Sequence, residues 1–313
     1  MRIREVLFGL VVTLMLLASA CSRQPAAPRP VNDKLAEILA RGTLIIATDV
    51  NYPPFSSLDE SIPRLTKTKC TAAQYTANQF SGFDAQTGVE IAKRLGVEPC
   101  FVTPQWSQLI AGNWSNVWDL HVGSMTPTYP RMEVLYFAQP YFATPIHVFV
   151  HAQNATYQKP EDLSGKRIGT CAGCTYESYL KGSLNLPGVK LNFRIQDPQI
   201  IAYDNEIPAF EDLSLGDGVK LDAIVTQISA GQDAITNGLK MRMLAEPLYF
   251  AYACPVIDKK NSRDPIRFLN RVTEIVLEMH RDGTLSALSI QWLGVDLTQK
   301  AAEFDLNSLQ QNP

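Results

Sequence analysis

The stretch of residues 119–141 constrains this chain more than any other part of its 313 residues. An apolar run of strand length ends at Gly123, and a turn with the hydroxyl groups of Ser124 and Thr126 follows. Arg131 stands directly before a second apolar run. A guanidinium is a planar fork that matches a carboxylate with two parallel hydrogen bonds. The turn therefore predicts a site for a small anion, although an ordinary proline-containing turn with a solvated arginine has the same local pattern.

The composition indicates a globular chain with a large core and no affinity for nucleic acid. With 46% hydrophobic and 19% charged residues, its length allows one large or two medium domains. The net charge is -3, and the sequence has no cluster of basic residues of the kind that binds nucleic acid. His147 and His151 would lie on one face of a strand but about 13 Å apart, so they cannot share a metal ion.

Motifs for catalysis are absent from the sequence. It has no nucleophile elbow, no zinc-protease helix motif and no phosphate-binding loop. We therefore expect a binding protein rather than an enzyme, with no cofactor and no metal.

The first twenty residues predict a lipoprotein signal peptide. Arg2 and Arg4 precede an apolar run over residues 6–17, which is short for a membrane span. Small residues then lead to Cys21, where a lipid such as palmitate would be attached. Plain secretion and a structural role for Cys21 stay open. A lipid would anchor the mature chain at the periplasmic or cell surface, in an oxidising compartment, with residues 22–32 as a flexible tether.

Strand-length apolar runs alternate with segments of helical spacing along the rest of the chain. Residues 33–41 predict a helix that stops at Gly42, and residues 43–48 predict a strand. Residues 264–280 predict a long helix with one apolar face.

Several motifs occur together in one order. Residues 124–131 read Ser-Met-Thr-Pro-Thr-Tyr-Pro-Arg and residues 137–141 read Phe-Ala-Gln-Pro-Tyr. Gly-Phe-Asp stands earlier, at residues 82–84, and Trp-Leu-Gly stands near the end, at residues 292–294. This order resembles the family 3 solute-binding proteins, periplasmic receptors that bring polar amino acids to ABC transporters. The resemblance covers nearly the whole mature chain.

The resemblance implies an α/β fold of the type II periplasmic-binding-protein class. Each of its two lobes would be a mixed sheet flanked by helices, and two strands would form the hinge. Lobe 1 would comprise residues 43–143 and 250–297, and lobe 2 would comprise residues 144–249. Residues 21–42 would form a tether and a short helix, and residues 298–313 would form a C-terminal tail. The expected partners are an amino acid and an ABC permease, and the expected state is a monomer.

The same resemblance implies a set of ligand-binding residues: Asp49, Tyr52, Phe55, Trp106, Ser124, Thr126 and Arg131 from lobe 1, with Thr175 and Gln227 from lobe 2. Arg131 and the N–H of Thr175 would take the carboxylate of the ligand. The Ser124 carbonyl and the Thr126 hydroxyl would take its amine. For the aromatic residues, simple core packing stays open.

Gln227 departs from the family pattern. The family motif at this place ends in an aspartate that binds the α-ammonium group, whereas residues 220–227 end in glutamine. A neutral amide supplies no countercharge, and a buried ammonium without one costs several kcal/mol. This mismatch motivates an alternative ligand, a carboxylate without a charged α-amine. A cyclohexadienyl dehydratase-like enzyme is a further alternative, for which the sequence offers no assignable general acid.

Six cysteines are present, and five remain if Cys21 carries lipid. Pairing is expected in an exported protein. The resemblance implies a Cys70–Cys100 disulfide, because some family members bridge this strand to a nearby loop. Cys171 and Cys174 form a C-x-x-C pattern where the family has Gln-Ala-Gly-Thr-Thr. A structural disulfide, a redox-active pair at a helix start, and a bridge from one of them to Cys254 all stay open.

Overall fold

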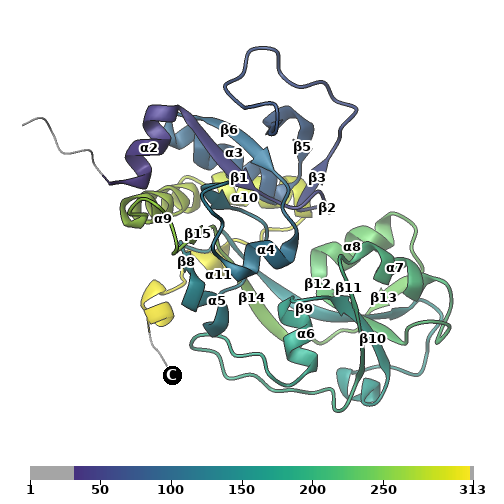
Figure 1. The fold of residues 1–313 in the computed structure, drawn as a ribbon. Coiled ribbons are helices and arrows are strands. Elements are labelled where there is room, and N and C mark those ends of the chain that lie inside the picture. Colours follow the sequence, from purple (N-terminus) through teal and green to yellow (C-terminus); the bar gives the residue numbers. More distant parts are fainter. Residues whose placement is uncertain (1–31, 311–313) are drawn as a thin grey trace, which may run out of the picture. The chain divides into compact units, whose positions relative to one another are not determined.

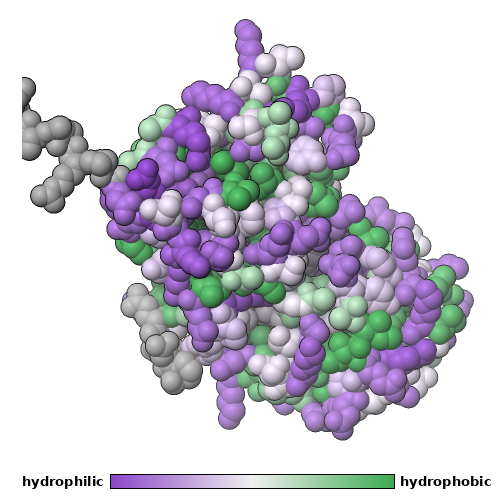
Figure 2. Space-filling view, viewed as in Figure 1, coloured by the Kyte–Doolittle hydropathy of each residue, from purple (hydrophilic) through white to green (hydrophobic). Residues whose placement is uncertain are grey.

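The computed structural model describes residues 32–310, so the expected signal peptide and Cys21 lie outside the described residues. Two six-stranded sheets, each with its own helices, form the framework, and a small three-stranded sheet adds to the first (Figure 1). No helix within residues 32–310 has the length and apolarity needed to cross a membrane. In Figure 2, hydrophilic residues cover most of the visible face and hydrophobic residues form separate small groups.

The first lobe is built on the sheet with strand order β4-β6-β1-β7-β15-β8. At its centre, β1 (Thr43–Ala47) is fully buried and pairs in parallel with β6 (Glu98–Val102) and β7 (Leu120–His121). A parallel strand covered on both faces is apolar throughout, which explains the Leu-Ile-Ile-Ala run. The remaining strands of this sheet are β4 (Tyr75–Thr76), β8 (Leu135–Phe137) and β15 (Val256–Asp258).

Helices of the first lobe include α2 (Lys34–Arg41) and α3 (Phe83–Leu95), both of which end at a glycine in the left-handed conformation. The long α9 (Ile266–Arg281) buries the predicted apolar face. The others are α4 (Trp106–Ala111), α5 (Tyr129–Val134) and α10 (Thr284–Leu293). The small sheet contains β2 (Asn51–Tyr52), β3 (Ser56–Leu58) and β5 (Phe80–Ser81).

The second lobe is built on the sheet with order β11-β10-β12-β9-β13, in which β14 also pairs with β9. Its strands are β9 (Phe142–His151), β10 (Arg167–Cys171), β11 (Gln199–Tyr203), β12 (Ala223–Gln227), β13 (Met241–Met243) and β14 (Tyr249–Ala253). Its helices are α6 (Thr175–Leu180), α7 (Ile207–Ser214) and α8 (Ile228–Thr236).

Two antiparallel strands, β9 and β14, connect the lobes. They pair from Phe142 opposite Ala253 to Ile146 opposite Tyr249. Figure 1 shows both strands running from the first lobe into the second. This is the arrangement expected for a two-strand hinge.

A buried ion network fixes the start of the first lobe. The Asp119 carboxylate lies 2.8 Å from the Lys34 ammonium, pairs with Arg41 and accepts a hydrogen bond of 2.9 Å from the N–H of Ile45. Asp119 and Lys34 are both fully buried. Asp119 is therefore the centre of an ion network that joins α2 to the sheet.

Replacing Asp119 by asparagine is expected to lower the free energy of unfolding by about 3–5 kcal/mol, because Lys34 loses its nearer and fully buried counter-ion and keeps only Glu37, at 3.5 Å. Urea unfolding followed by circular dichroism measures this. The matched control, Glu303→Gln, removes a negative charge from an exposed position and is expected to have almost no effect. Equal stability of the two variants would show that the network is not a stabilising feature.

Two disulfides are present in the structure. The predicted Cys70–Cys100 pair is confirmed, with its sulfur atoms 2.06 Å apart, and it attaches the loop before β4 to β6. Cys171 and Cys174 are bonded to each other, so the alternative bridge from one of them to Cys254 is wrong. Cys254 is buried and has no disulfide partner within the described residues.

The Cys70→Ser/Cys100→Ser double variant is expected to lose about 3.5 kcal/mol of unfolding free energy, because the disulfide closes a segment of 30 residues. Equilibrium denaturation of the oxidised proteins measures the difference. Solute affinity is expected to stay within about twofold, since neither cysteine lines the pocket described below. A loss below about 1 kcal/mol would contradict the expected role of this crosslink.

The C-terminal segment, for which the sequence predicts a tail, contains a short packed helix. Helix α11 (Gln299–Ala302) packs against β9, and Ala301 is fully buried. The Gln139 side chain donates a 2.8 Å hydrogen bond to the Ala301 carbonyl. A final 3-10 helix spans Leu306–Gln310. Small alanines and one apolar face allow this otherwise polar segment to pack.

Candidate functional site

A pocket lies between the two lobes, at the carboxyl ends of strands from both sheets. The space between its atoms, open solvent included, is about 620 Å³. In open α/β sheets, ligands bind at the carboxyl ends of the strands. The lining residues are Asp49, Asn51, Tyr52, Trp106, Gly123, Ser124, Thr126, Arg131, Cys171, Cys174, Thr175, Tyr176, Asp204, Asn205 and Glu206.

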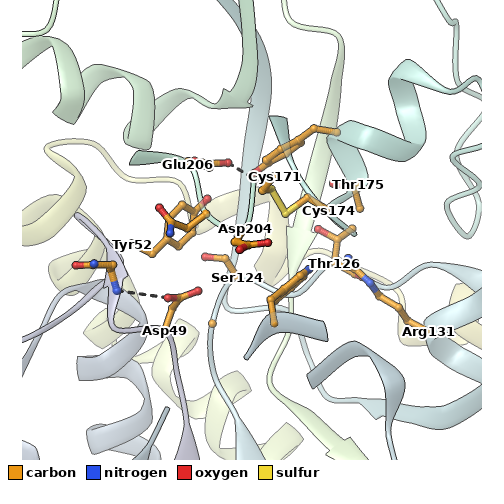
Figure 3. Close-up of a pocket in the computed structure, with 15 residues that line it drawn as sticks. Asp49, Tyr52, Ser124, Thr126, Arg131, Cys171, Cys174, Thr175, Asp204 and Glu206 are labelled. Carbon is orange, nitrogen blue, oxygen red and sulfur yellow. Dashed lines mark hydrogen bonds between the residues drawn. A yellow bond between two sulfur atoms is a disulfide. The ribbon is translucent and has the colours of Figure 1, made fainter. Parts of the chain in front are cut away.

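Seven of the nine predicted ligand residues line this pocket: Asp49, Tyr52, Trp106, Ser124, Thr126, Arg131 and Thr175. Figure 3 labels all of them except Trp106 and shows the labelled ones around one space. In particular, Arg131 and Thr175 lie in the same pocket although they belong to different lobes. Phe55 and Gln227 do not line it.

Arg131 is a buried cation without a counter-ion. Its guanidinium donates hydrogen bonds of 2.9 Å to the carbonyls of Thr126 and Gly173, and it lies 5.1 Å from the ring centre of Trp106. No carboxylate of the described residues pairs with it. Burial lowers the pKa of Arg131 to about 10, so the group is still protonated at neutral pH. A buried charge is costly unless it is paired, and the pocket is where an anion can reach it.

The turn before α6 places a second group beside this cation. Gly173 has a φ of 71°, which favours glycine, and its carbonyl accepts the hydrogen bond from Arg131. Thr175 is the first residue of α6, and its hydroxyl accepts a 2.9 Å hydrogen bond from Tyr249. A hydroxyl that accepts a hydrogen bond can still donate its own proton, so Thr175 offers both this hydroxyl and its backbone N–H to a solute.

Ser124 is held in an unusual conformation by a buried acid. Its φ of 53° lies in the left-handed region, its hydroxyl donates to Asp84 over 2.8 Å, and its N–H donates to the Tyr141 oxygen over 2.8 Å. The Tyr141 hydroxyl also donates to Asp84, over 2.7 Å. Burial raises the pKa of Asp84 to about 7. The hydroxyl of Ser124 is thus occupied, which leaves its carbonyl for a ligand.

Phe55 is a correction to the predicted site. Its ring is fully buried and stacks between Tyr52 and Phe142, with ring centres 5.1 and 5.5 Å away. The core-packing interpretation therefore holds for Phe55, whereas Tyr52 lines the pocket.

Gln227 is the second correction. The side chain is buried, and its amide donates a hydrogen bond to the Tyr52 hydroxyl. Because Tyr52 belongs to the first lobe and Gln227 to the second, this bond joins the lobes behind the pocket wall. One N–H of the amide is thus used by the tyrosine, and Gln227 is not among the residues that line the pocket.

The sequence of the chain matches a known family over most of its length. Residues 67–295 match the profile of the bacterial extracellular solute-binding proteins, family 3. The chain belongs to this family. The L-cystine-binding protein TcyJ of Escherichia coli (strain K12) is 26% identical over 297 residues, which cover 95% of this chain and 97% of that protein. ABC transporter arginine-binding protein 1 of the same strain is 25% identical over 246 residues, 77% of this chain and 86% of that protein.

Solved structures of similar proteins share the two-lobe fold. The ancestral amino acid-binding protein AncCDT-1, described as a precursor of cyclohexadienyl dehydratase, superposes with a TM-score of 0.66 at 25% identity, covering 83% of this chain and 99% of that chain. Holo ArgBP from T. maritima superposes with a TM-score of 0.63 at 21% identity, and the match covers 80% of this chain and 98% of that chain. The expected fold class is confirmed by these structures and by the two sheets.

The pocket also contains two acids that were not among the predicted ligand-binding residues. Asp204 and Glu206 follow the carboxyl end of β11, next to Asn205. No family motif includes them. However, they directly follow a strand, and ligands in α/β sheets bind at the carboxyl ends of strands, so the sequence does contain a signal for them. With Asp49, they give the pocket three carboxylates. No cluster of three or more His, Cys, Asp or Glu in the described part of the chain is arranged to hold a metal ion.

Proposed function

We propose that this family 3 protein captures a polar amino acid in the pocket between its lobes and delivers it to an ABC transporter permease. The observation that carries the proposal is the buried, uncompensated Arg131 in one pocket with the first N–H of α6. A carboxylate fits both groups, because it accepts two parallel bonds from a guanidinium and further bonds from amides. The relatives named for cystine and arginine support an amino acid as the carboxylate.

In this proposal Arg131 and the Thr175 N–H bind the carboxylate, and the Ser124 carbonyl and the Thr126 hydroxyl bind the amine. Tyr52 and Trp106 cover the solute. Gln227 supplies no countercharge, and the carboxyl groups available to a cationic group of the solute are those of Asp49, Asp204 and Glu206. A solute without a charged amine, which the neutral Gln227 had suggested, is less well matched, since three carboxylates line the pocket.

We further propose the lobe boundaries given by the sequence, residues 43–143 with 250–297 and residues 144–249, and closure of these lobes about β9 and β14. The hydrogen bonds from Arg131 to Gly173 and from Gln227 to Tyr52 join the lobes and support a closed arrangement. A lipid on Cys21 would tether the monomeric receptor to the membrane close to its permease.

A thermal-shift panel of L-amino acids, 2-keto acids and prephenate tests the proposal. A ligand at a hundred times its dissociation constant stabilises the protein by about 2.7 kcal/mol, which gives a clear rise in the melting temperature. We expect this rise for one or more amino acids and not for keto acids. Stabilisation by keto acids alone would reject an amino-acid receptor.

The enzyme alternative is weaker, because the relatives named above are binding proteins. The pocket nevertheless contains an acid that can be protonated near neutral pH. This acid is Glu206, and burial raises its pKa to about 8. Prephenate is therefore also incubated with the protein and assayed for turnover. Turnover would replace the receptor function with a dehydratase-like one.

A further inference from the structure

Glu206 presents an unsatisfied carboxylate oxygen to the pocket. The residue is only 5% exposed. Its Oε2 accepts a 2.8 Å hydrogen bond from the Thr226 hydroxyl. Its Oε1 lies 3.7 Å from Cys171 Sγ, which has no proton to donate because it belongs to a disulfide. Within the described residues Oε1 thus receives no hydrogen bond from an N–H or O–H group, a costly state for a buried carboxylate.

Asp49 faces the same space from the other lobe. It follows β1, lines the pocket and accepts a 3.3 Å hydrogen bond from the N–H of Asn51. Burial raises the pKa of both carboxyls, and the charge of Asp49 raises the pKa of Glu206 further. The neighbouring Tyr52 and Tyr176 have pKa values well above the ordinary value and stay neutral. When both are ionised the two acids repel each other, and no cation of the described residues is among the groups that shift their pKa values.

The cation of the pocket lies elsewhere. Arg131 is the single arginine or lysine among the lining residues. Figure 3 shows it on the opposite side of the pocket from Glu206 and Asp49. The pocket is therefore dipolar, with an anion site at one end and two uncompensated acids at the other.

We propose that Asp49 and Glu206 hold a positively charged group of the solute between the lobes, so that the protein selects amino acids whose cationic group is remote from the carboxylate. L-Arginine and L-cystine, with its second ammonium group, have this chemistry. The inference rests on the proposed function, because it takes Arg131 as the carboxylate site. A cation bound by acids from both lobes also favours closure, since it replaces a repulsion by two attractions.

The change at residue 227 fits this arrangement. Gln227 is neutral and bonded to Tyr52, whereas Glu206 reaches the end of the same strand through its hydrogen bond with Thr226. The second lobe therefore still has a buried acid near the end of β12. This acid comes from the loop before α7, and in this proposal it binds a different part of the solute.

Isothermal titration calorimetry at pH 8 on wild type, Glu206→Gln and Glu211→Gln tests the inference. Glu211 is exposed on α7, so its variant removes a negative charge from the same helix without touching the pocket. The first probe pair is L-arginine and L-citrulline, which have nearly the same shape and differ in the remote charge. The second pair is L-cystine and the mixed disulfide of L-cysteine with 3-mercaptopropionate, which lacks the remote ammonium.

The pair that decides is the one whose charged member, L-arginine or L-cystine, binds to wild type. For this pair we expect wild type and Glu211→Gln to bind the charged member about thirtyfold more tightly, or more, than the neutral one. Glu206→Gln is expected to bring the two members within about threefold. Retained preference in Glu206→Gln overturns the inference, and so does wild-type binding of the neutral member as tightly as the charged one. If Glu206→Gln does not fold, as judged by circular dichroism, Asp49→Asn from the other lobe decides by the same criteria.

The proposed function fails in a distinguishable way. If no amino acid binds wild type, the receptor function is lost and this inference with it. If wild type binds only amino acids with neutral side chains, the receptor function stands and the inference alone is overturned.

Discussion

Arg131→Gln is expected to weaken amino-acid binding by about a hundredfold or more. In the proposed function this buried guanidinium binds the solute carboxylate, and losing one partner of a buried, hydrogen-bonded charge pair costs about 2–5 kcal/mol. Glutamine can donate one hydrogen bond but carries no charge and has no fork. Calorimetry with L-arginine or L-cystine measures the loss.

The stability of the solute-free variant separates binding from folding. Arg131→Gln loses the hydrogen bonds to Thr126 and Gly173, but it also removes an unpaired buried charge, so we expect only a small change in melting temperature. Arg242→Gln is the matched control. Arg242 also donates to two backbone carbonyls, those of Asn154 and Tyr157, and it lies outside the pocket. Affinity losses that are equal in the two variants would refute a direct role for Arg131.

Affinity for a cationic amino acid is expected to fall about tenfold per pH unit below pH 8, or about a hundredfold between pH 8 and pH 6. Burial raises the pKa of Glu206 to about 8 in the free protein. Below that value the carboxyl is protonated and neutral, and it must release its proton to pair with the solute cation. A bound cation lowers the pKa, so binding releases a proton and is favoured by rising pH. Arg131, with a pKa of about 10, stays charged across this range.

Calorimetry at pH 7 in buffers with different ionisation enthalpies counts the released protons directly. We expect close to one proton for wild type and clearly fewer for Glu206→Gln, whose affinity should depend less on pH in this range. Asp84, which bonds to Ser124 and has a pKa raised to about 7, is the same in both proteins. Burial also raises the pKa of Asp49, which lines the same pocket and is unchanged in the Glu206→Gln variant. A flat affinity between pH 6 and pH 8 in wild type would contradict the role given to Glu206.

The comparison of sequence and structure shows which parts of the site are encoded locally. The turn with Ser124, Thr126 and Arg131 is one continuous segment, so its motif predicts three lining residues at once. Thr175 is predictable in the same way, because a strand, a tight turn and a helix start follow each other in sequence. The two sheets follow from the alternation of apolar runs and helical spacings.

The remaining features depend on contacts between segments that are distant in sequence. Phe55 and Tyr52 are both aromatic, and only the packing of Phe142 against Phe55 shows which of them is in the core. Gln227 belongs to a motif position, yet the Tyr52 hydroxyl from the other lobe takes its amide. Glu206 has no motif, and its burial results from Thr226 and Cys171 on two neighbouring strands.

The Cys171–Cys174 disulfide forms part of the pocket wall, directly before the helix that starts at Thr175. Such a bond forms where thiols are oxidised and not in the reducing cytosol. A newly made chain thus has an unfinished binding surface until it has been exported. Maturation of the cargo site is in this way coupled to arrival at the compartment where cargo is collected.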